Sequence, residues 1–116
     1  MSMQFEELEV RKLAREITNK FAKIFYSPKF RNYSFQDQIM RACISVGNNI
    51  AEWRERSSNK EFVKFLYYSK WSIWEVRNMV YYALDFAYID EKTYTELIHE
   101  CRNLSVKISN FIKALK

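Results

Sequence analysis

The chain has 116 residues, 48% hydrophobic and 28% charged, with one glycine and one proline. This composition suits a single domain over residues 1–116 with one core, excludes a turn-rich β fold and favours a few long helices. No apolar run approaches the roughly 20 residues that cross a membrane, and the acidic start lacks the apolar segment of a signal peptide, so we expect a cytoplasmic protein.

The first two predicted helices are separated by a proline. The first spans about Met3 to Tyr26 and ends before Pro28. Its apolar positions recur at helical spacing at Phe5, Leu8, Leu13, Ile17, Phe21 and Ile24. The second begins after Ser34, a predicted N-cap, and reaches roughly Arg56. Its apolar stripe is formed by Phe35, Ile39, Ala42, Val46, Ile50 and Trp53.

Two further helices are expected, and each has a capping signal. Ser58, with Glu61 three residues on, opens the third helix, which extends to about Tyr88, and Asp90 caps the fourth. The third stripe contains Phe62, Leu66, Ser69, Ile73, Val76, Val80, Ala83 and Ala87. The fourth contains Tyr94, Leu97, Cys101, Leu104, Ile108, Phe111 and Leu115. Short connectors between long helices predict an all-α fold, an antiparallel up-down-up-down four-helix bundle.

A second apolar line runs along the third predicted helix beside its core stripe. It consists of Tyr67, Trp71, Trp74, Tyr81 and Tyr88, with Tyr68 and Tyr82 alongside. These rings either wrap sideways over the first and fourth helices or contact another subunit, because four helices offer no further layer. We expect them to form an oligomer interface.

Polar residues form a line of their own on the second helix, at Arg41, Ser45, Asn48, Glu52 and Arg56. It is a solvated or subunit-facing row, and the sequence does not decide between burial, interface and solvent. Glu52 and Glu75 could act as acid and base only if the fold brought them together, which their spacing does not show.

No complete catalytic or metal-binding set can be assembled. Cys43 and Cys101 fall on apolar stripes and are expected in the core. Glu96 and His99 make one E-x-x-H, whereas di-iron bundles need two such motifs, and His99 is the only histidine. We therefore expect no enzyme activity, no cofactor or metal and no small-molecule substrate.

Charge supplies a hint about partners. Nineteen Lys and Arg against fourteen acids give +5. Bases gather at the turn between the second and third helices, at Arg54, Arg56, Lys60 and Lys64. These four residues are the predicted contact with RNA or DNA, although so modest an excess often serves solubility alone.

A motif connects these features to a family. Residues 45–66 read S-V-G-N-N-I-A-E-W-R-E-R-S-S-N-K-E-F-V-K-F-L, and W-S-I-W-E follows at 71–75. The pattern resembles that of small bacterial four-helix-bundle proteins encoded in intervening sequences of 23S ribosomal RNA genes. The matching positions are Asn49, Ile50, Ala51, Glu52, Ser72 and Glu75. The resemblance implies a homopentameric ring and no known catalytic role. A similar fold and ring occur in the accessory variability determinant of diversity-generating retroelements, which contacts a reverse transcriptase and RNA.

The chain departs from the family pattern at three places. Trp53 and Trp71 stand where the family shows glycine, so either the local helix spacing differs or both rings point outward. Gly47 and Asn48 stand where the family often has proline and serine, so a bend in the second helix is expected to be kept by a different residue.

Two hypotheses of function follow. One is a non-enzymatic oligomeric module that binds RNA, DNA or a nucleic-acid-handling protein through basic rims. The other is a structural or protein-binding homo-oligomer that acts through the aromatic surface of the third helix.

Overall fold

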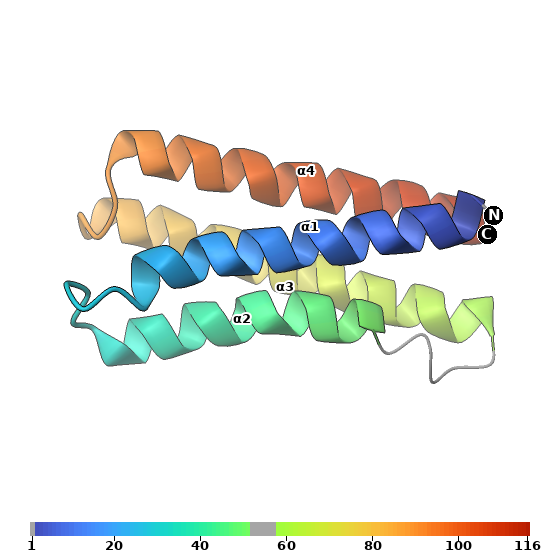
Figure 1. Cartoon of the computed structure of the whole chain (residues 1–116), viewed down its shortest axis with the longest axis horizontal. Helices are drawn as coiled ribbons and strands as arrows, with labels where there is room; N and C mark the ends of the chain where they lie inside the picture. The colour runs from blue at the N-terminus through green and yellow to red at the C-terminus, as the bar shows by residue number, and fades with distance from the viewer. Residues whose placement is uncertain (1, 52–57) are drawn as a thin grey trace.

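Four α-helices form the described part of the computed structural model, which covers residues 2–51 and 58–116. They are α1 (Ser2–Phe25), α2 (Tyr33–Ala51), α3 (Asn59–Asp85) and α4 (Glu91–Leu115). Successive helices run in opposite directions, and the two ends of the chain lie together at one end of the bundle (Figure 1). The predicted antiparallel up-down-up-down bundle is confirmed.

The helices occupy the four corners of the bundle. Within the described residues α1 and α3 each pack against α2 and α4 but not against each other. In Figure 1, α1 is nearest the viewer and α3 lies behind it. Each helix therefore buries one side in a shared core and turns the other side outward.

The core follows the predicted stripes of α2, α3 and α4 closely. Phe62 and Phe111 are fully buried and meet edge to face with ring centroids 5.3 Å apart. The buried positions include Ile39, Val46, Ile50, Leu66, Ile73, Val76, Val80, Leu97, Leu104 and Ile108. Each such side chain contributes roughly 1.5–3 kcal/mol by leaving water, so this continuous apolar seam supplies most of the drive to fold.

The predicted face of α1 is wrong in its first two turns. Phe5 and Leu8 are exposed, at 67% and 52% of their surface, and Glu7 is buried instead. The buried positions of the helix are Glu7, Val10, Ala14, Ile17, Phe21 and Phe25. This set keeps steps of three or four from Glu7 to Phe25, so it faces the core continuously, and Phe5 and Leu8 lie to one side of it. Arg11 Nη1 lies 3.3 Å from the Glu7 carboxylate and compensates part of that burial.

Side chains cap the N-termini of α2, α3 and α4. Two of the three predicted N-cap residues are confirmed. Ser58 Oγ accepts from the Glu61 backbone N–H at 3.2 Å, as predicted. Asp90 also acts as predicted, because its side chain accepts from the Thr93 N–H at 2.8 Å. The prediction that Ser34 caps α2 is wrong.

The cap of α2 is Asn32, two residues before the expected one. Its Oδ1 accepts from the Phe35 N–H, and its carbonyl oxygen accepts from the Gln36 N–H, both at 3.0 Å. Asn32 also donates from Nδ2 to the Tyr88 hydroxyl at 2.8 Å, which joins this turn to the segment after α3. The predicted end of α2 at Arg56 lies outside the described residues.

α3 ends at Asp85, three residues before the predicted position, in a left-handed turn. The Ala87 N–H bonds to the Leu84 carbonyl at 3.0 Å, and the Tyr88 N–H bonds to the Ala83 carbonyl at 2.8 Å. This pair of bonds is the Schellman arrangement, which places one residue in the left-handed region, and Ala87 has φ 60°. Ala87 is therefore exposed in the turn and is not part of the core stripe.

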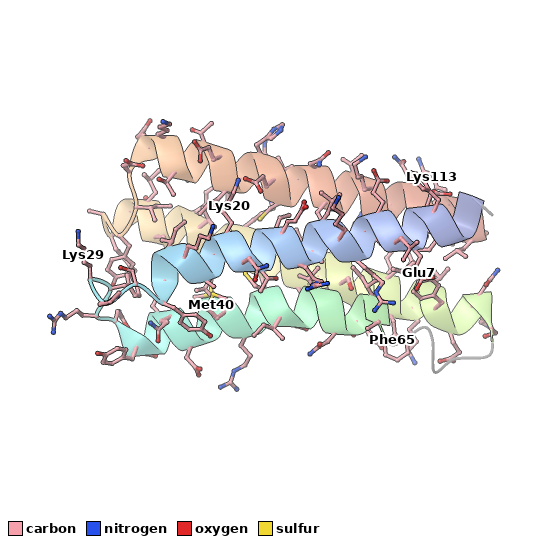
Figure 2. The ribbon with its side chains drawn as sticks, viewed as in Figure 1. Glu7, Lys20, Lys29, Met40, Phe65 and Lys113 are labelled. Carbon is pink, nitrogen blue, oxygen red and sulfur yellow. The ribbon has the colours of Figure 1, made fainter. Side chains whose placement is uncertain are left out.

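Two ion pairs join α1 and α4, which run side by side. Lys20 pairs with Glu100 and lies between the two helices in Figure 2. Lys107 Nζ lies 3.3 Å from a Glu9 carboxylate oxygen near the other end. The hydrogen bond that the Lys20 ammonium donates to the Glu100 carboxylate raises the pKa of Lys20. None of the described helices has a stretch long and apolar enough to cross a membrane.

We predict that Ala87→Gly raises the free energy of unfolding by about 1 kcal/mol, because glycine adopts φ near +60° without the steric cost that a Cβ imposes. Urea denaturation followed by circular dichroism measures the change. The matched control is Ala22→Gly inside α1, which should destabilise by a similar amount. Destabilisation by Ala87→Gly would contradict the left-handed conformation.

Candidate interaction surface

The outer side of α3 is lined with large aromatic side chains. We call this surface the aromatic face, formed by Tyr67, Tyr68, Trp71, Trp74, Tyr81, Tyr82 and the helix C-cap Phe86. Trp71 and Trp74 are the most exposed of them, at 77% and 65%. Steps of three, four and seven residues place these rings on the side opposite the buried stripe. Of the two alternatives left open for Trp71, a different helix spacing or an outward ring, the structure shows an outward ring.

Tyr81 marks the edge of the aromatic face toward α4. Its ring lies 5.9 Å from that of Tyr94. Hydrogen bonds from the guanidinium groups of Arg77 and Arg102 lower the pKa of the Tyr81 hydroxyl. Tyr81 therefore contributes to the packing of its own chain, whereas Trp71 and Trp74 turn most of their surface to solvent.

Tyr88 does not continue the aromatic face, contrary to the prediction. It follows the left-handed turn and is half-buried. Its ring meets Phe30 and Phe35 edge to face, with centroids 4.8 and 5.1 Å away. The early end of α3 is the reason, because the chain changes direction before Tyr88 and turns the ring inward.

Open grooves flank the aromatic face on both sides. The groove between α3 and α4, of about 800 Å³, is lined by Lys70, Trp71, Trp74, Glu75, Arg77 and Ser105. The groove between α2 and α3, of about 830 Å³, contains Arg41, Asp37, Glu75 and Tyr82. Trp71 and Trp74 line one of these grooves and Tyr82 the other, so rings of the aromatic face border open grooves on both sides.

Hydroxyl and amide groups join α2 to the inner side of α3. Ser72 Oγ donates to Ser45 Oγ at 3.0 Å, and Asn49 Nδ2 reaches the same oxygen at 3.2 Å. Ser69 Oγ, fully buried, donates to the Val46 carbonyl at 2.8 Å. Because buried hydroxyls are costly without partners, these bonds favour one register of α3 on α2. In the sequence these residues belong to separate patterns, and the placement of small serines beside or within the apolar stripes is the signal that could have joined them.

The family-motif residues thus divide between core, helix contact and surface. Asn49 and Ser72 belong to the hydrogen-bonded contact, and Ile50 is fully buried. Ala51 is half-buried and Glu75 is exposed. Glu52 and Trp53 lie outside the described residues, so the structure does not place Glu52 relative to Glu75.

Predicted basic and polar residues lie mainly at the surface where they are described. Lys60 and Lys64 are exposed at the start of α3, while Arg54 and Arg56 lie outside the described residues. On the polar line, Arg41 pairs with Asp37 at 2.7 Å. Asn48 is exposed and Ser45 is half-buried, so the described part of this line is not one buried row.

The cysteines and the Glu96–His99 pair offer little chemistry in this fold. Cys43 and Cys101 are buried free thiols, and burial raises the pKa of both, that of Cys101 to about 12. Such thiols stay protonated at neutral pH and react slowly. Glu96 and His99 are exposed, and the described residues contain no group of three or more His, Cys, Asp or Glu placed to hold a metal ion.

Comparison with known proteins identifies the class. The sequence profile of the 23S rRNA-intervening sequence protein family matches residues 6–110, so the chain belongs to that family. A crystal structure of a protein of unknown function from the S23 ribosomal protein family of Bacteroides thetaiotaomicron is similar, with a TM-score of 0.77 and 19% identity. The match covers 97% of this chain and 99% of the other, and it shows a shared fold. No curated protein sequence matches.

We predict that Ser45→Ala and Ser72→Ala each lower the free energy of unfolding by about 1 kcal/mol, because each leaves its partner hydroxyl short of a bond. The double variant should be less destabilised than the sum, with a coupling of about 0.5–1 kcal/mol in urea denaturation. Ser34→Ala, at an exposed position without a capping role, is the control and should have little effect. Strict additivity would contradict a shared hydrogen bond.

Proposed function

We propose that the protein is a non-enzymatic, cytoplasmic interaction module that self-associates through the aromatic face of α3. The supporting observation is the exposure of two tryptophans and their neighbouring rings along one side of a helix that has no further layer to cover it. Trp and Tyr are the residues that most often dominate binding energy at protein interfaces, and contiguous apolar patches are rare on monomers.

A ring of five chains is the assembly that the family resemblance suggests. In such a ring, the aromatic face of each subunit would contact a neighbouring subunit, and the polar surfaces would remain exposed to solvent. Five chains at +5 each would together carry about +25, which favours association with a polyanion.

Nucleic-acid contact is the second part of the proposal. Lys60 and Lys64 are exposed, and neither has an ion pair within the described residues, so their charges are available to phosphates. With Arg54 and Arg56 they form a basic cluster that a ring would repeat, and repetition converts weak contacts into avidity. A purely structural or protein-binding assembly is the alternative if this cluster does not bind.

We predict that Trp71→Ser combined with Trp74→Ser shifts the protein toward its 14.1 kDa monomer mass in light scattering, with helicity retained. Both rings are mainly solvent-exposed in one chain, so their loss removes interface rather than core. Tyr33→Ser is the matched control, because Tyr33 is 70% exposed but belongs to α2 and not to the aromatic face of α3. An unchanged mass for the double tryptophan variant would count against this interface.

We predict that the protein retards RNA and DNA at low salt with little sequence preference. Changing Arg54, Arg56, Lys60 and Lys64 to Ser should weaken binding and flatten its dependence on salt, since each lost phosphate contact lowers the slope by roughly 0.7–0.9. The control variant changes four exposed bases that have no ion pair in the described residues (Lys23, Lys29, Arg31 and Lys92) to Ser, and so loses equal charge. Equal binding by the cluster variant and the parent would leave only the protein-binding function.

A further inference from the structure

The chain's single glycine occupies a position that nothing in its own described structure requires. Gly47 lies inside α2, which continues to Ala51, although glycine is among the least favourable residues in a helix interior. Its φ is not positive, and a Cβ added there would meet no atom within 4 Å. Neither backbone conformation nor internal packing explains the missing side chain, which points to a contact from outside.

Gly47 lies in a groove between α1 and α2. The groove has a volume of about 300 Å³ and is lined by Arg11, Ala14, Arg15, Thr18, Asn19, Ile44, Gly47, Asn48 and Ala51. Small side chains at Ala14, Gly47 and Ala51 keep it open. Ile44 is apolar yet 46% exposed, so the groove offers apolar contact as well as room.

Cations of this groove can pair with two acids on the outer side of α3. Arg15 is exposed without an ion pair in the described residues, and Arg11 pairs only along its own helix, with Glu7. Glu75 and Asp85 on the outer side of α3 are exposed acids that also lack an ion pair there. Guanidinium groups are favourable neighbours of carboxylates and of tryptophan faces alike.

We propose that the α1–α2 groove of one copy receives the aromatic face of α3 from a second copy. This inference rests on the proposed self-association and names the surface that completes it. The two surfaces belong to different sides of the bundle, since α1 and α3 stand at opposite corners (Figure 1). One chain therefore engages two neighbours at once, in a head-to-tail contact that closes into a ring or extends as a filament.

The first test fills the groove. Gly47→Leu should weaken association about ten-fold or more in sedimentation equilibrium, because the added side chain occupies the space that the incoming ring needs. Gly47→Ala should raise the melting temperature of the isolated chain, measured in the Trp71→Ser, Trp74→Ser background, since alanine favours the helix. Asn103→Leu, which adds the same side chain at an exposed position of α4, is the control and should leave association unchanged.

The second test leaves the groove open, because it changes an exposed residue at the rim and adds no bulk at Gly47. Asn48→Cys and Asn78→Cys place thiols at the groove rim and on the outer side of α3, and both native asparagines are exposed. The double variant should form intermolecular disulfides under copper-phenanthroline oxidation, whereas each single variant should form few. The native thiols are buried and provide a low background.

The outcomes separate this inference from the proposed function. Disulfide dimers of Asn78→Cys alone would show that α3 packs on α3 and would overturn the groove contact. So would a Gly47→Leu protein that associates as tightly as the parent while the double tryptophan variant dissociates, and self-association through α3 would then stand. If the tryptophan variant also remains assembled, the proposed interface itself fails.

Discussion

The four-helix arrangement gives each helix one buried side, and among residues 2–51 and 58–116 no second layer covers the outer side of α3. This constraint matters because the outer side of α3 carries large exposed aromatic rings, whereas the outer side of a solvated helix is mainly polar. Trp71 and Trp74 expose most of their surface there, while the opposite side of the same helix carries the fully buried Phe62, Leu66 and Val80. A helix with two apolar sides needs two partners, and one chain supplies only the first.

The contact between α2 and α3 connects the core to this surface. Hydrogen bonds among Ser45, Asn49 and Ser72, and from Ser69 to the α2 backbone, favour a single rotation of α3 about its axis. Rotation of α3 would bury different rings and expose others, so this polar contact determines which aromatics face outward. We propose that the family motif mainly positions the aromatic face of α3. In the same proposal, Gly47 of α2 belongs to the α1–α2 groove that receives the aromatic face of another copy.

Apolar spacing was sufficient to predict the bundle and most of the buried stripes of α2, α3 and α4, whereas it left the direction of Trp71 open. It failed where a local backbone detail decides the outcome. Ala87 adopts a left-handed conformation that alanine seldom takes, so the end of α3 and the inward turn of Tyr88 could not be read from the pattern. In α1 the predicted stripe began with Phe5 and Leu8, whereas the buried stripe begins with Glu7, a charged residue that apolar spacing does not detect. The Ser45–Ser72 bond joins two helices, whereas periodicity describes one helix at a time.

The central claim is that the aromatic face is covered by another copy of this chain. Sedimentation equilibrium of the unmodified protein across the micromolar range tests it most directly. We expect one discrete species larger than the 14.1 kDa chain, with five subunits as the assembly suggested by the family resemblance. A protein that remains monomeric throughout this range would contradict the account.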